Sequence, residues 1–159
     1  MIELRPYQDT LVNAFDQKVT DGIRRIIIVA PTGSGKTLIA SEIIKRGVAA
    51  HKNILFVAHR NELLTQARDK LRDFEVTAGI IKAGRDKDAR PWAFVQVAGI
   101  QTLHAPADIL IVDEAHHVRA MTYQKIIEAY PNAIIIGLTA TPCRGDGRGL
   151  GNVFDAMLE

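Results

Sequence analysis

The sequence contains a single cysteine, Cys143, and so excludes a disulfide within the chain. It contains no run of 18 apolar residues, and its first ten residues, MIELRPYQDT, lack the apolar centre of a signal peptide. A lone cysteine also suits a reducing compartment. Together these absences predict a soluble, cytoplasmic protein with no membrane partner.

An excess of charge of either sign is also missing. The chain has 20 Lys and Arg against 18 Asp and Glu, which gives a net charge of +2 at pH 7. This balance excludes a protein that binds nucleic acid through general phosphate attraction alone, but it does not exclude a local basic face. The length of 159 residues and the hydrophobic fraction of 47% predict one globular domain, residues 1–159.

Buried strands and amphipathic helices alternate along the chain. Branched apolar runs predict strands at Arg25–Ala30, Asn53–Ala58, Val76–Lys82, Phe94–Ala98, Asp108–Val112 and Ala133–Leu138. Apolar residues at three- and four-residue steps predict helices from Pro6 to the Asp21-Gly22 turn, from Lys36 to Val48, at Asn61–Phe74 and at Met121–Tyr130. The charged segment Ala83–Pro91 is predicted to be a surface loop. The alternation predicts an α/β fold with a mostly parallel sheet and helices on both faces.

A polar cluster follows five of the predicted strands. The clusters are Thr32–Thr37, His59-Arg60, Gln101-Thr102, Asp113–His116 and Thr139–Thr141. The carboxyl ends of parallel strands meet at one edge of a sheet, and ligands of such sheets bind at that edge. We therefore expect these clusters to form one active site.

The segment APTGSGKT, Ala30–Thr37, follows the first predicted strand and opens a helix. It matches the phosphate-loop pattern G-x-x-x-x-G-K-[ST] except that Ala30 replaces the first glycine. Glycines in such a loop let successive backbone N–H groups face one anion, and the helix N-terminus adds its positive end. The alternative is an ordinary Gly/Ser turn. The residues assigned to the nucleotide are Pro31, Thr32, Gly33, Ser34, Gly35, Lys36 and Thr37, with Lys36 on the β- and γ-phosphates and Thr37 on Mg²⁺.

The segment DILIVDEAH places Asp113 and Glu114 directly after another buried strand. Mg²⁺ takes oxygen ligands and commonly one or two carboxylates, which suits Asp113. Glu114 is a candidate base for the attacking water. The alternative is two solvated carboxylates that cap the next helix. Combined with the phosphate loop, the pair predicts a site for ATP and Mg²⁺ in which Glu114, Lys36 and Asp113 are the catalytic residues.

Six segments in order resemble the motifs of superfamily 2 DNA/RNA helicases and translocases of the DEAH-box type, in their first RecA-like lobe. They are RPYQ (Arg5–Gln8), APTGSGKT, VAHRNELLTQ (Val57–Gln66), VAGIQTL (Val97–Leu103), DEAH (Asp113–His116) and LTATP (Leu138–Pro142). RGDGRGL, Arg144–Leu150, is similar to the tail after the last motif in the Rad25-like branch. The resemblance implies a RecA-like P-loop NTPase domain, an ATP hydrolase activity and a nucleic-acid partner, with DNA favoured over RNA.

The resemblance also implies roles for single residues. Gln8 would bind the adenine edge with Arg5 nearby, although a glutamine in a first helical turn is usually only solvated. His116, Thr139 and Thr141 would couple the nucleotide to nucleic acid; hydrogen bonds within strand-end turns are the plainer alternative. The residues that would contact the sugar–phosphate backbone are Arg60, Gln66, Gln101 and Thr102.

Members of this family carry a second RecA-like lobe with a QxxGRxxR motif, and no such motif occurs here. We therefore expect one lobe of a larger enzyme, nearly inactive in hydrolysis without the second lobe. Two alternatives stay open, the motor lobe of a restriction-type double-stranded DNA translocase and a nucleotide-dependent binding module that does not hydrolyse ATP. The sequence does not distinguish unwinding from translocation, nor does it fix the polarity, pathway or oligomeric state.

Overall fold

The computed structural model describes residues 3–30, 35–58, 60–81, 93–100, 105–115, 118–140 and 154–159. The helices are α1 (Pro6–Thr20), α2 (Lys36–Ala49), η1 (a 3-10 helix, Asn61–Leu63), α3 (Leu64–Asp73) and α4 (Ala120–Ala129). The strands are β1 (Arg25–Val29), β2 (Ile54–Ala58), β3 (Gly79–Ile81), β4 (Val95–Gly99), β5 (Ile109–Val112), β6 (Ile134–Thr139) and β7 (Ala156–Leu158). Within these ranges no helix has the length and apolar character to cross a membrane.

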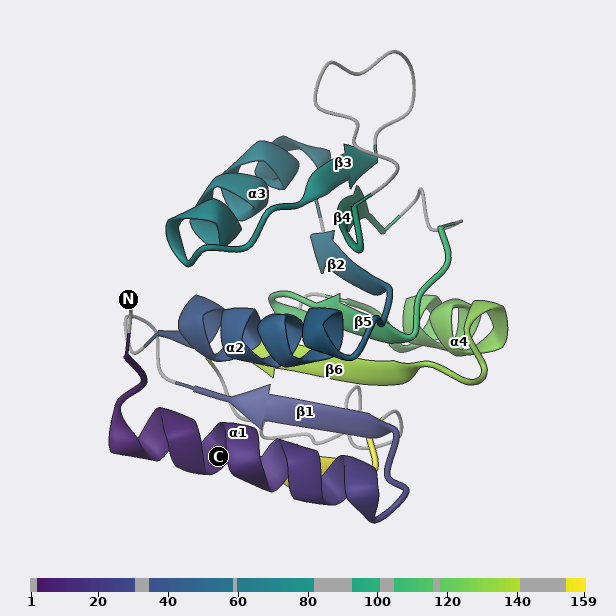
Figure 1. Ribbon diagram of the computed structural model, residues 1–159. Helices are drawn as coiled ribbons and strands as arrows, with labels where there is room; N and C mark the ends of the chain where they lie inside the picture. The colour runs from purple at the N-terminus through teal and green to yellow at the C-terminus, as the bar shows by residue number, and fades with distance from the viewer. Residues whose placement is uncertain are drawn as a thin grey trace.

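The strands form one sheet in the order β3-β4-β2-β5-β6-β1-β7 (Figure 1). All six pairings in the described sheet are parallel. The four central strands β2, β5, β6 and β1 are buried almost throughout, since both of their faces are covered. In the sequence, burial on both faces corresponds to continuous runs of branched apolar residues such as Ile26–Val29.

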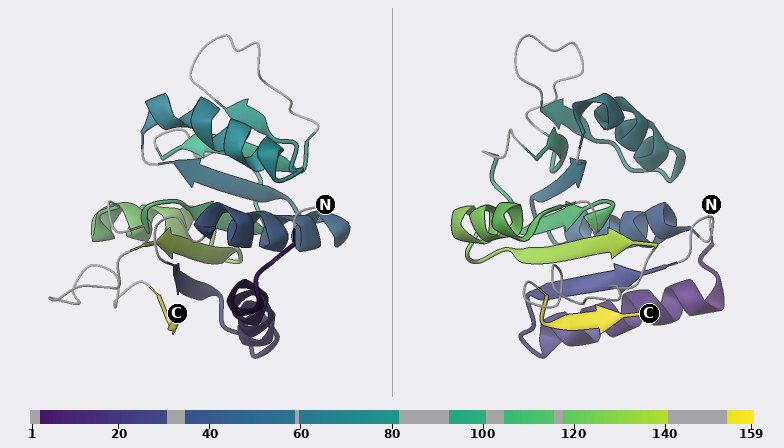
Figure 2. Two further views of the ribbon diagram at one scale, coloured as in Figure 1. Left: turned by 90° about the vertical axis from the view of Figure 1, so that its left-hand side faces the viewer. Right: turned by 180° about the vertical axis from the view of Figure 1, so that it is seen from behind.

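Helices cover both faces of the sheet, as Figure 2 shows. α1, α2 and α3 lie on one face, where their apolar side chains join Ile26, Ile28 and Phe56 in one core cluster. α4 lies on the other face, where Tyr123 and Ile126 pack with Ile27 and Leu110. The predicted α/β class is confirmed, and the sheet is wholly rather than mostly parallel.

The structure corrects several details of the sequence prediction. The helix predicted at Asn61–Phe74 begins as the 3-10 turn η1, and the strand predicted at Val76–Lys82 is shortened to β3. β7 was not predicted, because three residues at an edge carry no readable alternation. Tyr7 precedes Leu11 and Phe15 at four-residue spacing, a pattern that places it on their apolar face, but it is exposed at the helix start. The predicted loop Ala83–Pro91 lies outside the described residues.

The second face of the sheet is closed around Gly137 in β6. Phe154, which leads into β7, packs edge-on against Tyr123, with ring centroids 5.3 Å apart. A Cβ on Gly137 would lie 2.7 Å from the Phe154 ring and 3.0 Å from the Ala115 side chain. The absence of a side chain at this position therefore sets how closely Phe154 approaches the sheet.

We expect Gly137→Ala to lower the free energy of unfolding by about 1–3 kcal/mol, because the added methyl overpacks a filled site. The measurement is urea unfolding of the wild type, of Gly137→Ala, of Phe154→Leu and of the double variant. Removing the ring should relieve the overlap, so the double variant should lose less than the sum of the single losses. Strictly additive losses would contradict this packing.

Candidate active site

The candidate site lies where β1, β5 and β6 end. β6 pairs with β5 on one side and with β1 on the other. The segment that leads to Lys36 follows β1, and Asp113 follows β5, so both flank the end of β6. The last residue of β6, Thr139, is fully buried, and its carbonyl accepts a hydrogen bond of 3.0 Å from the Ala30 N–H. The strand order thus gathers three of the predicted clusters at one edge.

Lys36 joins the two predicted halves of the site directly. Its Nζ donates to Glu114 Oε1 at 2.6 Å and lies 3.4 Å from Asp113 Oδ1. The lysine side chain is 14% exposed, while the two carboxylate side chains are about a third exposed, at 31% and 34%. One cation thus faces two anions, and the residual charge of −1 opens toward solvent. A site of this charge can attract a divalent cation, and its lysine can then turn to an anionic ligand.

Glu114 adopts a left-handed backbone conformation, with φ of +51°. In the described part of the chain, two other non-glycine residues have positive φ, His51 and Glu75, and both directly follow helix ends, where this conformation is common. Glu114 follows a strand instead. Asp113 Oδ1 accepts its backbone N–H at 3.0 Å, and the Asp113 N–H bonds the Val57 carbonyl at 2.9 Å. Unusual backbone of this kind concentrates at functional sites, and here it presents a carboxylate to Lys36.

Tyr123 in α4 supports this turn, a role that no pattern in the sequence predicts. Its hydroxyl donates to the carbonyl of Ala115 at 2.9 Å, and its side chain is fully buried. A buried tyrosine needs a partner for its hydroxyl, but the spacing of residues in the sequence does not identify that partner. The bond anchors the residue that follows Glu114.

Gln8 is buried against the start of α2, not solvated. It is 2% exposed, and its Oε1 accepts the Arg5 backbone N–H at 2.8 Å, as in a capping arrangement. Gly35, with φ of +87°, precedes α2, and a Cβ there would overlap the Gln8 amide nitrogen. The structure therefore brings Arg5, Gln8 and Gly35 together. The solvated alternative for Gln8 is wrong, while its role toward adenine stays a prediction.

The residues present suit a Mg²⁺ ion. Asp113 offers a partly exposed carboxylate, and Thr37, in the first turn of α2, is half-buried. Within the described ranges no three His, Cys, Asp or Glu side chains gather into a metal-binding group. Mg²⁺ commonly keeps waters and substrate phosphates and uses one or two protein carboxylates.

Two of the predicted nucleic-acid residues lie in the described part of the chain. Arg60 follows β2 and Gln66 lies on α3, and both are exposed. A contact with the sugar–phosphate backbone requires an exposed side chain, but exposure alone does not test the predicted contact. The predicted residues that lie outside the described part of the chain are Pro31, Thr32, Gly33, Ser34, Gln101, Thr102, His116 and Thr141.

Comparison with known proteins agrees with this architecture. Residues 1–144 match the family model described as "Type III restriction enzyme, res subunit". The chain is 32% identical over 155 residues to the DNA 3'-5' translocase XPB2 of Sulfurisphaera tokodaii, covering 92% of this chain and 33% of that protein. It is also 32% identical over 159 residues to the Type I restriction enzyme EcoAI endonuclease subunit of Escherichia coli, covering 87% of this chain and 19% of that protein.

A solved structure shares the fold. The crystal structure of the UvsW helicase from bacteriophage T4 superposes with a TM-score of 0.82 at 23% sequence identity, covering 99% of this chain and 60% of that one. The RecA-like fold that the sequence predicted is thereby confirmed. The chain spans a third or less of the length of the curated relatives named above.

We expect Gly35→Ala to destabilise the protein more than Gly22→Ala does. Both glycines have positive φ, near +90°, so each alanine brings backbone strain of about 1–2 kcal/mol. Only at Gly35 would the methyl displace the Gln8 side chain. This displacement costs about 1 kcal/mol more, because the hydrogen bond from the Arg5 N–H to Gln8 is lost. Urea unfolding measures both losses. Gln8→Ala combined with Gly35→Ala should remove the excess; equal losses at the two glycines would contradict the contact.

Proposed function

The chain belongs to the family of the Type III restriction enzyme res subunit, and from this membership we propose that it is the first, ATP-binding RecA-like lobe of a longer DNA helicase or translocase. The observation that carries the proposal is the ion pair of Lys36 with Glu114, with Asp113 beside it. This arrangement joins the lysine of the predicted phosphate loop to two strand-end carboxylates at one edge of the sheet. Partial burial of charged side chains costs free energy, and such groups gather at functional sites. A nucleotide-binding site would account for the partly buried charges at this edge.

We propose a role for each charged group when ATP binds. Lys36 leaves the carboxylates and binds oxygens of the β- and γ-phosphates. Asp113 and Thr37 hold Mg²⁺, which when bound would neutralise part of the phosphate charge. Glu114, released from Lys36, accepts a proton from the water that attacks the γ-phosphorus. The half-exposed position of Glu114 leaves it accessible to that water.

The remaining contacts extend the proposal. Loop residues from Pro31 to Gly35 would hold the phosphates, and Gln8 with Arg5 would hold the adenine edge. His116, Thr139 and Thr141 would transmit the state of the nucleotide. The sugar–phosphate backbone of the nucleic acid would be contacted by Arg60, Gln66, Gln101 and Thr102. The DEAH-box type and the Rad25-like branch rest on the sequence resemblance.

A second RecA-like lobe is the proposed partner for hydrolysis. Transfer of the γ-phosphoryl group needs positive charge on its far side and exclusion of water. An arginine supplied from a second lobe contributes about 10³–10⁵ in rate in other phosphate-loop enzymes. We therefore propose that these 159 residues alone bind ATP and hydrolyse it slowly, and that the protein is cytoplasmic.

A second candidate function has a specific observation in its favour. The matching family model is that of a restriction-enzyme subunit, and a relative is a restriction endonuclease subunit. The chain would then be the motor lobe of a protein that moves on duplex DNA without separating the strands. A strand-displacement assay on the longer protein separates this function from unwinding. A module that binds nucleotide without turnover is the third candidate.

We expect Mg²⁺ with ATP or ADP to bind the wild-type chain and Lys36→Ala to weaken ATP binding at least tenfold, because a charge-assisted bond to phosphate is lost. Isothermal titration calorimetry measures the dissociation constants. Lys70→Ala, which removes the same charge from an exposed position on α3, is the control and should bind as the wild type does. Equal binding by wild type and Lys36→Ala would overturn the site.

We expect Glu114→Gln in the longer protein to bind ATP and to lose most of its hydrolysis, because the amide keeps the shape of the side chain and removes the base. Steady-state phosphate release should fall by about 10²–10⁴. ATP affinity should hold or rise, since the Lys36 partner is no longer an anion. Phosphate release at the wild-type rate would show that Glu114 is not the base.

A further inference from the structure

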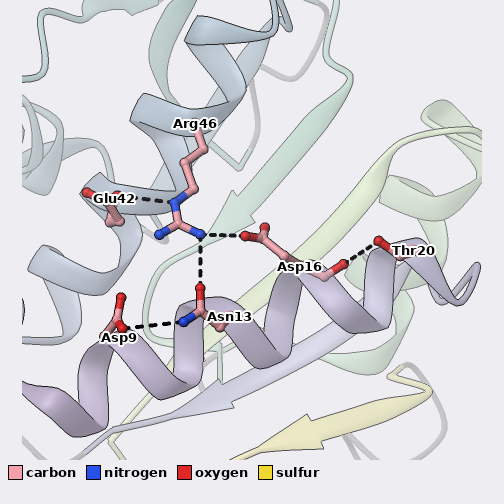
Figure 3. Close-up of polar contacts among 6 residues, drawn as sticks. All are labelled: Asp9, Asn13, Asp16, Thr20, Glu42 and Arg46. Atoms are coloured by element: carbon pink, nitrogen blue, oxygen red, sulfur yellow. Dashed lines mark hydrogen bonds and ion pairs between the residues drawn. The ribbon is translucent and has the colours of Figure 1, made fainter.

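Arg46, in the last turn of α2, joins that helix to α1 through a group of polar bonds (Figure 3). Its Nε donates to Glu42 Oε1 at 3.1 Å, one turn earlier on α2. Its Nη1 donates across to α1, to the Asp16 carboxylate and to Asn13 Oδ1, the latter at 3.4 Å. We call Asn13, Asp16, Glu42 and Arg46 the Arg46 clamp. Among the described residues it holds the sole ion pair between α1 and α2.

The clamp is continuous with the start of α1. The Asn13 side-chain amide, which accepts from Arg46, also donates to Asp9 Oδ2 at 3.4 Å. Asp9 lies in the first turn of α1, next to Gln8. Figure 3 shows this line of bonds running back along α1 from the guanidinium. A change at Arg46 can thus reach the turn that carries Gln8.

The guanidinium of Arg46 remains charged. Burial lowers the pKa of Arg46, but its hydrogen bonds with Asp16 and Glu42 and their negative charges outweigh this effect, so the pKa lies above its ordinary value. A cation whose pKa is raised by folding stabilises the fold at all pH values below its ordinary pKa, and this stabilisation is lost only as the pH rises above that value. In neutral buffers Arg46 therefore stays protonated.

The two helices run in the same direction (Figure 1), and polar side chains meet at two separated places along them. Near their N-termini, Gln8 lies against Gly35. About three turns further along α2, Arg46 holds Asp16 and Asn13. Between these places the helices share an apolar core, which includes Leu11, Phe15, Ile39 and Ile43.

Apolar packing alone does not fix how far one helix slides along the other. The hydrophobic effect is non-directional and depends mainly on buried area. A slip of one residue along a helix is about 1.5 Å, which is enough to take an amide out of hydrogen-bond range. The bonds of the Arg46 clamp are directional, so they resist this axial motion. The clamp therefore adds a directional restraint on the register of α1 against α2 to the restraint that the packed core provides.

We propose that Arg46 is a positioning residue for nucleobase recognition, and that it acts through Gln8. By restraining the register of α1 it helps to hold the Gln8 amide in place relative to the start of α2, where Lys36 would bind the phosphates of the same nucleotide. The proposal rests on the proposed function, because it assumes that ATP binds at Lys36 and that Gln8 contacts its base. It assigns to Arg46 a share in the preference for adenine, with no contact of its own to the nucleotide.

Arg46→Met is the main test variant, because it keeps an unbranched apolar stem of similar reach and removes the guanidinium. Lys45→Met is the matched control. Lys45 neighbours Arg46 on α2 and pairs with Glu75 at 3.5 Å, which is a contact away from α1. Calorimetry with Mg²⁺ gives dissociation constants for ATP, GTP and inorganic tripolyphosphate. Arg46→Met should raise the dissociation constant for ATP about fivefold, which is the effect of one hydrogen bond, and change that for tripolyphosphate by less than about twofold. Lys45→Met should change neither dissociation constant.

A double variant tests whether Arg46 acts through Gln8. In a Gln8→Ala background, Arg46→Met should have no further effect on ATP affinity, since the group it positions is gone. Arg46→Lys keeps the charge and one bond to α1, so it should lose less ATP affinity than Arg46→Met. This variant also serves the test if Arg46→Met does not fold, which circular dichroism would reveal.

The outcomes separate the two proposals. A wild type that binds neither ATP nor tripolyphosphate overturns the proposed function and this inference together. If the wild type binds both ligands, two results would overturn the positioning role alone. One is that Arg46→Met and Arg46→Lys lose affinity for ATP and for tripolyphosphate equally, or lose affinity for neither. The other is that Arg46→Met weakens ATP binding in the Gln8→Ala background as much as in the wild type. The expected pattern, a loss confined to ATP and dependent on Gln8, supports it.

Discussion

The pairing of Lys36 with Glu114 depends on almost everything else in the fold. The two residues are 78 positions apart in the chain, and they meet because β1 and β5 both flank β6 in a parallel sheet. If the strand order were different, the lysine and the carboxylate would lie at separate places along the edge. The left-handed backbone of Glu114 and the Tyr123 hydroxyl bond to Ala115 then direct the carboxylate toward the lysine. The charged group is small, and the sheet, the turn and α4 each contribute to its geometry.

α2 carries groups of the candidate site at one end and the Arg46 clamp at the other. Its first turn carries Lys36 and Thr37, and its last turn carries Arg46. α1 contacts the start of α2 through Gln8 and the end of α2 through the clamp. The separation of Gln8 from Lys36 therefore depends on one helix pair. If ATP binds as proposed, a polar residue far from its phosphates would thereby affect how its base is held.

Much of the fold and of the candidate site could be predicted from the sequence, because the patterns that indicate them lie within short segments. Runs of branched residues identified β1, β2, β5 and β6, and the polar residues after them identified the edge where Lys36, Asp113 and Glu114 meet. What could not be predicted depends on contacts between distant segments. The burial of Gln8 follows from how α1 docks, and a glutamine in a first helical turn is usually solvated. The bonds of Arg46 depend on which faces of α1 and α2 meet, and β7 is too short for any pattern. The preference for DNA over RNA has no counterpart among the described contacts.

The place of β1 in the sheet has a consequence for synthesis of the chain. β1 pairs only with β6 and β7 among the described strands, and β6 begins about a hundred residues after β1 ends. On a ribosome that adds about 5–20 residues per second, the strand waits roughly 5–20 s for its first neighbour. During that interval Ile26, Ile27 and Ile28 have no strand to pair with. The sheet edge at which Lys36, Asp113 and Glu114 meet is therefore completed only after β6 has been synthesised.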